Sequence, residues 1–142
     1  MPVRNARTEW TGGLQDGTGR VSLTSSGVGT YDVSFPKRSA DDADGTTSPE
    51  ELIAAAHSAC FSMAFSNALA QAGHTAEEIN TKADVTFQPG TGITGSHLTL
   101  AARVPGISAD DFQRLAEEAK TGCPVSAALT GIEITLDATL AS

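Results

Sequence analysis

Cysteine is scarce in this chain, and this scarcity narrows the chemistry that the chain can carry out. Cys60 and Cys123 are the only two cysteines among 142 residues, and they are far apart in the sequence. Without paired CxxC spacing there is little support for a zinc site. The sequence also shows no flavin, haem or nicotinamide signature. We therefore expect no bound metal or cofactor, and any redox chemistry must come from the two thiols.

Basic residues are also few. Nine Lys and Arg residues stand against seventeen Asp and Glu residues, which gives a net charge of -8. Such a chain repels phosphate backbones and anionic lipid surfaces, so nucleic acid and membranes are not expected partners. The first residues, Met1 to Asn5, contain no apolar run that could act as a signal peptide. We expect a cytoplasmic protein whose cysteines rest as thiols.

Charge is absent from the stretch 52–76, which has the length of a long helix. The stretch could span a membrane by length, but its Ser, Asn, Gln and His residues make it too polar for lipid. A capping box formed by Ser48 and Glu51 predicts that the helix begins at residue 49, and Gly73 is a typical stop. We therefore expect a long helix buried in the protein, with Cys60 near its middle.

The rest of the chain alternates between strand and helix patterns. Strands are predicted before the long helix, and a hairpin, a second helix, a short third helix and a closing strand are predicted after it. The corresponding segments are Arg20–Thr24, Val28–Phe35, Ala83–Val104, Ser108–Gly122, Pro124–Leu129 and Ile132–Leu140. Strands grouped in blocks between helices indicate an α+β fold with mostly antiparallel pairing. The length predicts one domain, residues 1–142.

The two cysteines differ in how well their surroundings should favour a thiolate. Cys123 precedes Pro124 at the start of a predicted helix, where free amides and the helix dipole stabilise an anion. Cys60 lies about eleven residues inside its helix, roughly 16 Å from the helix start, where the dipole effect has faded. A thiolate at Cys60 would therefore need a cationic side chain. The alternative is that both cysteines are small buried hydrophobic residues.

Two sequence motifs resemble those of a known family. The segments Thr47–Ala64 and Lys120–Ser126 closely resemble the OsmC (osmotically inducible protein C) family, which belongs to the larger group containing the organic hydroperoxide resistance proteins. The similarity extends from Trp10 to the closing strand Glu133–Asp137. It implies an OsmC-like α+β fold, with antiparallel sheets around a long central helix. It also implies an intertwined homodimer with two active sites shared at the subunit interface.

The resemblance also implies an activity and four site residues. The family members are thiol peroxidases that reduce organic hydroperoxides, and hydrogen peroxide more weakly, under oxidative or osmotic stress. Cys60 matches the peroxidatic cysteine, Cys123 the resolving cysteine and Glu50 the carboxylate that holds an arginine. That arginine should be Arg38 rather than the adjacent Lys37, because a planar guanidinium can bond a carboxylate and face a thiolate together. The reductant implied is an external dithiol of the lipoyl type.

Two points stay open at this stage. His57 lies one helical turn before Cys60 and could be a general base or hydrogen-bonding helper, a metal ligand together with the two cysteines, or a packing histidine. The whole chain could instead be a binding module without enzymatic activity, which carries a lipid-like or other small ligand and has a redox-sensitive cysteine pair.

The resemblance and the helix prediction together suggest how the site is shared between subunits. If residues 50 and 60 lie on one continuous helix, they are separated by roughly 15 Å along its axis. A glutamate and an arginine can hardly bridge this distance and also contact the sulfur. We therefore expect that Arg38 and Glu50 act on the Cys60 of the partner subunit.

Overall fold

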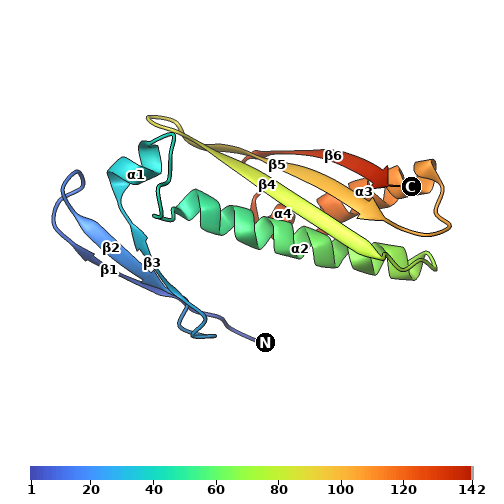
Figure 1. Cartoon of the computed structure of the whole chain (residues 1–142), viewed down its shortest axis with the longest axis horizontal. Helices are drawn as coiled ribbons and strands as arrows, with labels where there is room; N and C mark the ends of the chain where they lie inside the picture. Colours follow the sequence, from blue (N-terminus) through green and yellow to red (C-terminus); the bar gives the residue numbers. More distant parts are fainter. Residues whose placement is uncertain (142) are drawn as a thin grey trace. The chain divides into compact units, whose positions relative to one another are not determined.

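The computed structural model describes residues 1–141, and the chain forms two compact units, Met1–Leu52 and Ile53–Ser142. We call them the N-terminal unit and the C-terminal unit. The prediction of a single domain stays a prediction. In chain order, the elements labelled in Figure 1 are β1 (Arg7–Thr11), β2 (Thr18–Ser22), β3 (Thr30–Val33), α1 (Phe35–Ser39), α2 (Pro49–Gln71), β4 (Glu78–Gln88), β5 (Gly92–Arg103), α3 (Ala109–Gly122), α4 (Pro124–Ala128) and β6 (Glu133–Ala141).

The N-terminal unit is an antiparallel sheet in the order β1-β2-β3, followed by the short helix α1. The sequence predicted a strand up to Phe35 and a loop from Arg38. Instead, β3 ends at Val33, and Arg38 lies on α1. The reason is local, because the Ser34 hydroxyl caps α1 and Pro36 stands in its first turn, where the missing amide hydrogen costs nothing.

Helix α2 begins at Pro49, as predicted, and runs without interruption to Gln71. The Ser48 hydroxyl accepts a hydrogen bond from the Glu51 amide at 3.1 Å, which is one half of the predicted capping box. The other half is absent, because the Glu51 carboxylate accepts from the Thr47 hydroxyl instead. Gly73 follows the helix with φ of 84°, a left-handed conformation that glycine adopts without strain.

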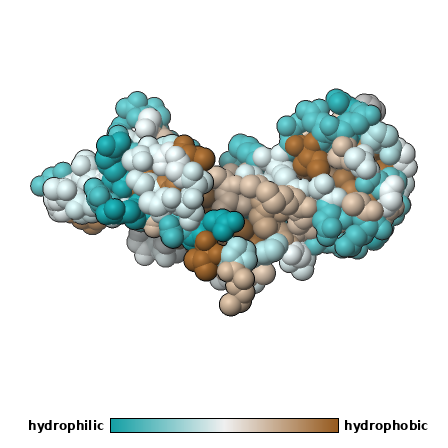
Figure 2. Space-filling view, turned by 90° about the horizontal axis from the view of Figure 1, so that it is seen from below, coloured by the Kyte–Doolittle hydropathy of each residue, from teal (hydrophilic) through white to brown (hydrophobic). Residues whose placement is uncertain are grey.

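Helix α2 is buried along one stripe rather than all round. His57, Phe61, Phe65 and Leu69, spaced four residues apart, are almost completely buried, whereas Met63 is 72% exposed. The exposed side is a weakly hydrophobic, pale-brown surface in Figure 2. By length and composition alone α2 could also cross a membrane, a test that the core helices of soluble proteins pass as well. Within a single chain only one face of α2 is buried, so the prediction of a buried helix is confirmed for that face alone.

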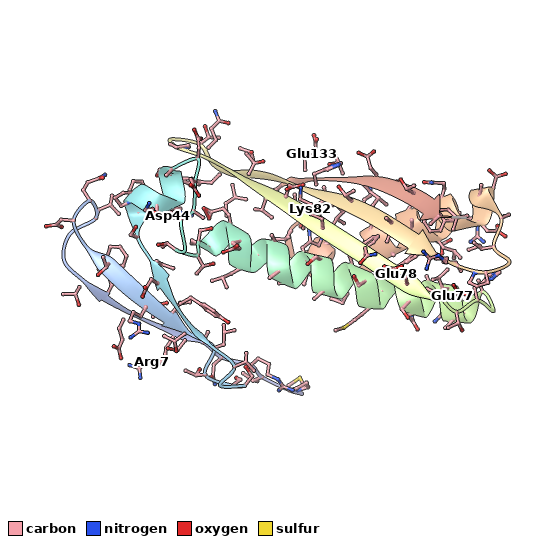
Figure 3. The ribbon with its side chains drawn as sticks, viewed as in Figure 1. Arg7, Asp44, Glu77, Glu78, Lys82 and Glu133 are labelled. Atoms are coloured by element: carbon pink, nitrogen blue, oxygen red, sulfur yellow. The ribbon has the colours of Figure 1, made fainter. Side chains whose placement is uncertain are left out.

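The C-terminal unit contains a second three-stranded sheet in the order β4-β5-β6. The predicted hairpin is confirmed by the antiparallel pairing of β4 with β5, but β6 pairs parallel to β5. This parallel pairing requires a long connection, which α3 and α4 provide. Side chains alternate along β4, and Figure 3 shows Glu78 and Lys82 from its exposed face.

The hydrophobic core of the C-terminal unit lies between this sheet and the helices α2 and α3. The Phe65 ring stacks with Phe61 at a centroid distance of 6.2 Å and meets Phe112 of α3 edge-on at 5.5 Å. Leu98 and Leu100 of β5 are fully buried in the same cluster. Because aromatic rings from both helices interlock, the core fixes α2 relative to α3 and thereby positions Cys60 on α2 and Cys123 directly after α3.

Candidate active site

The C-terminal unit brings the two cysteines together. Cys60 lies on α2, and Cys123 is the single residue between α3 and α4, where it forms the C-cap of the first helix and the N-cap of the second. Pro124 has no amide hydrogen to continue α3, so the chain turns at Cys123 and starts a new helix. Both thiols are free, Cys60 is partly exposed and Cys123 is fully buried. The two thiols lie close enough to interact, and each shifts the pKa of the other.

The surroundings of the sulfurs favour a thiolate on Cys123. Burial is the largest effect on both, and it raises the pKa of Cys60, which the hydrogen bond with Cys123 raises further. For Cys123, hydrogen bonds from Cys60, from the backbone and hydroxyl of Ser126 and from the Val125 backbone outweigh burial and lower the pKa.

His57 occupies the buried face of α2 beside this pair. Its Nδ1 lies 2.7 Å from the Ser96 hydroxyl and its Nε2 lies 2.8 Å from the Ser126 hydroxyl, so both ring nitrogens are hydrogen-bonded. Burial lowers its pKa below the usual 6.5 and favours the neutral ring. Within residues 1–141, no three His, Cys, Asp or Glu side chains are grouped to hold a metal. The geometry therefore supports a hydrogen-bonding role over the metal-ligand alternative.

Sequence reasoning missed the two serines that hold His57. Ser126 is three residues after Cys123 and belongs to the same sequence motif, so the short helix after Pro124 could have pointed to it. Ser96 carries no such local signal. It comes from β5 and reaches His57 only through the packing of the sheet against α2.

Arg38 and Glu50 meet in the N-terminal unit. Arg38 Nε donates to both carboxylate oxygens of Glu50, at 2.7 and 3.1 Å, and the Glu50 side chain is only 8% exposed. A carboxylate so far removed from water requires such a partner. Lys37 instead pairs with Asp44 at 3.2 Å on the surface. The predicted pair of Arg38 with Glu50 is therefore present, and Lys37 takes no part in it.

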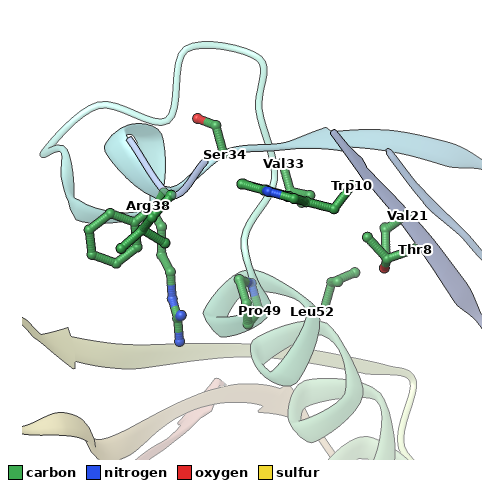
Figure 4. Close-up of a pocket in the computed structure, with 10 residues that line it drawn as sticks. Thr8, Trp10, Val21, Val33, Ser34, Arg38, Pro49 and Leu52 are labelled. Atoms are coloured by element: carbon green, nitrogen blue, oxygen red, sulfur yellow. The ribbon is translucent and has the colours of Figure 1, made fainter. Parts of the chain in front are cut away.

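A cavity of about 390 Å³ lies beside Arg38 within the N-terminal unit. Figure 4 shows Arg38 and Trp10 on its walls together with Pro49 and Leu52 of the first turn of α2. Apart from Arg38, Thr8 and Ser34, the lining is apolar, with Leu14, Val21, Val33 and Phe35 as further members. The cavity therefore combines an apolar lining with one cation, a composition suited to a molecule with a hydrocarbon part and a polar end.

The four predicted site residues thus form two pairs. Cys60 and Cys123 lie together in the C-terminal unit, and Arg38 and Glu50 lie together in the N-terminal unit. The catalytic roles assigned to them stay predictions.

Comparison with known proteins identifies relatives along the whole chain. A sequence model of the family described as OsmC-like protein matches residues 41–137. Peroxiredoxin OsmC of Escherichia coli (strain K12) is 42% identical over 142 residues, which cover 98% of this chain and 97% of the relative. Organic hydroperoxide resistance protein OhrA of Bacillus subtilis (strain 168) is 31% identical, with 96% of each chain covered.

A solved structure agrees with these sequence matches. An organic hydroperoxide resistance protein from Elizabethkingia anophelis superposes with a TM-score of 0.71 at 30% identity, covering 99% of each chain. The family match includes Glu50 and both cysteines, while Arg38 lies just before it. Because the match takes in most of the chain and the relatives align along nearly all of it, the chain belongs to the OsmC-like protein family.

Proposed function

We propose that this chain is a cysteine-based peroxidase that reduces organic hydroperoxides and, more weakly, hydrogen peroxide. The names of its relatives, peroxiredoxin and organic hydroperoxide resistance protein, support a peroxidase-type role. The observation that carries the proposal is the pair of interacting thiols, in which Cys60 is partly exposed and Cys123 is fully buried. In this proposal a peroxide reaches the partly exposed Cys60 first, and the neighbouring Cys123 then reacts with the oxidised product.

The proposed reaction has two steps. The Cys60 thiolate attacks the distal oxygen of the hydroperoxide, the O–O bond breaks, and the alkoxide leaves and takes up a proton to become an alcohol. Cys60 is then a sulfenic acid. The Cys123 thiolate attacks the Cys60 sulfur, a disulfide forms, and hydroxide leaves and takes up a proton from solvent to become water. An external dithiol, which we propose to be of the lipoyl type, returns both cysteines to thiols.

In this proposal Cys60 needs a cation, because its pKa is raised within the pair. We assign this role to Arg38, held by Glu50, from the partner subunit of a homodimer. The exposed apolar side chains support such a dimer, since Met63 on α2 is 72% exposed and Trp10 on β1 is 43% exposed. Exposed apolar groups of this kind are common at surfaces that a second chain covers.

The apolar cavity of the N-terminal unit favours a second candidate, a binding module for a lipid-like or other small ligand. One equivalent of cumene hydroperoxide, followed by mass spectrometry, separates the two functions. A peroxidase should lose two hydrogens within seconds as the Cys60–Cys123 disulfide forms. A reaction no faster than that of free cysteine would contradict the peroxidase and leave the binding module.

Single cysteine variants then test the two roles. Cys60→Ser should abolish turnover, whereas Cys123→Ser should consume about one peroxide per subunit and stop as a sulfenic acid or a mixed disulfide. Multiple turnover by Cys123→Ser with the same dithiol would show that the resolving role assigned to Cys123 is wrong.

A further inference from the structure

A row of polar side chains crosses the core of the C-terminal unit and ends at Cys123. It consists of Ser96, His57 and Ser126, which are 1%, 0% and 4% exposed. The two hydrogen bonds within the row measure 2.7 and 2.8 Å, and the Ser126 hydroxyl also interacts with the Cys123 sulfur. Every buried polar side-chain atom within residues 1–141 has a partner. Burying polar side chains among Phe and Leu side chains costs desolvation free energy even when every polar atom is hydrogen-bonded, so we expect this row to have a function.

The geometry of this row allows two arrangements of its hydrogen atoms. The two partners of His57 on α2 are hydroxyl groups, one from Ser96 on β5 and one from Ser126 on α4. The buried ring is neutral and carries one N–H. If Nε2 carries it, Ser126 accepts from His57 and its own hydrogen is available for Cys123. If Nδ1 carries it, the Ser126 hydroxyl donates to Nε2 and offers nothing to the sulfur.

We propose that Ser96, His57 and Ser126 form a directional hydrogen-bond relay that aims the Ser126 hydroxyl at the Cys123 sulfur and makes Cys123 the leaving thiolate when a dithiol reduces the disulfide. Ser96 donates to Nδ1, Nε2–H donates to Ser126, and Ser126 donates to sulfur. His57 is thus a positioning residue that acts through Ser126, not a base for Cys60. The relay rests on the proposed function, because it serves the recycling of the proposed disulfide.

The exposure of the two sulfurs sets the direction of reduction. A thiolate of the dithiol reaches the partly exposed Cys60 rather than the buried Cys123. It forms a mixed disulfide with Cys60, the Cys60–Cys123 bond breaks and its electron pair goes to Cys123. The second thiol of the dithiol then releases Cys60. Exchange is faster when the leaving thiol has a low pKa, so a hydroxyl donor on Cys123 accelerates the first step.

The first test measures the Cys123 thiolate directly and requires no peroxide. In a Cys60→Ser background Cys123 is the only thiol, and its ultraviolet absorbance against pH gives its pKa. Adding Ser126→Ala should raise this pKa by about one unit or more, because a donor to a charged acceptor is lost. Ser126→Thr keeps a hydroxyl and should restore it. The matched control is Ser62→Ala, which removes a half-buried hydroxyl bonded to Thr81.

A second test applies even where Ser126→Ala does not fold. The chain has three histidines, and His74→Gln with His97→Gln leaves His57 alone. Nitrogen-15 NMR of this chain, in the Cys60→Ser background and above the Cys123 pKa, should show the Nε2–H tautomer. The Nδ1–H tautomer, or an unchanged Cys123 pKa in Ser126→Ala, would overturn the relay.

A kinetic measurement connects the relay to reduction. With both cysteines present, Ser126→Ala should slow reduction of the disulfide by dithiothreitol roughly threefold, and Ser62→Ala should not. Equal rates would overturn the leaving-group role. If the chain failed to reduce hydroperoxides, the titration and the tautomer would still report on the relay, so the two proposals can fail separately.

Discussion

Mixing two inactive variants tests whether the active site is shared between subunits. Arg38 is bound to Glu50 at 2.7 Å, which holds its guanidinium near the start of α2. α2 is continuous, so residues 50 and 60 are separated by about 15 Å along its axis. If the partner supplies Arg38, a heterodimer of Cys60→Ser and Arg38→Ala chains has one complete site. Equal mixing gives about half heterodimers, each with one of two sites, so about one quarter of the wild-type peroxidase activity should return.

The assay is hydroperoxide consumption with a dithiol after subunit exchange, with heterodimers verified by mass. The matched control mixes Cys60→Ser with Cys123→Ser, which should recover no multiple turnover, because both cysteines of a site come from one chain. Verified heterodimers of Cys60→Ser and Arg38→Ala without activity would refute the shared site. So would full activity in a verified monomer.

Three further predictions follow from the described contacts. Arg38→Ala should raise the pKa of Cys60, as read from thiolate absorbance, because the thiolate loses its cation; an unchanged titration would remove Arg38 from the site. Phe61→Ala should lower the free energy of unfolding by about 3–5 kcal/mol, as measured in urea, whereas the exposed Val28→Ala should cost little. The folded-state pKa of His57 lies below its usual 6.5, so as the pH falls the unfolded chain binds the proton first. His57 should therefore make the free energy of unfolding decrease as the pH drops below about 6.5. His57→Gln should flatten this pH dependence in urea titrations, and an unchanged slope would contradict the prediction.

Local signals in the sequence predicted where α2 and α3 begin, but not α1. Ser48 with Pro49 fixed the start of α2 and Ser108 fixed the start of α3, since each serine accepts from an amide three residues on. Pairing partners were less predictable. The alternating pattern of β6 shows which side chains face the core, but it does not specify the neighbouring strand, and so its parallel pairing with β5 was not foreseen.

The candidate site was predictable only in part. The resemblance pointed to the pairing of Arg38 with Glu50, and the position of Cys123 before Pro124 indicated which thiol ionises more readily. The partners of His57 could not be found in the same way. Ser96 is distant in sequence and reaches the ring only through the packing of β5 on α2, which no local pattern encodes.

The position of Cys60 and Cys123 also links the proposed disulfide to folding. The bond would close a loop of about 60 residues running from α2 through the second sheet to the turn after α3. Removing that much chain freedom from the unfolded state stabilises the oxidised form by about 4 kcal/mol in the chain-entropy account. The same free energy makes the folded disulfide harder to reduce than an unfolded one. The reduced chain, ready for the next peroxide, is therefore the form that unfolds first and that a protease would remove first.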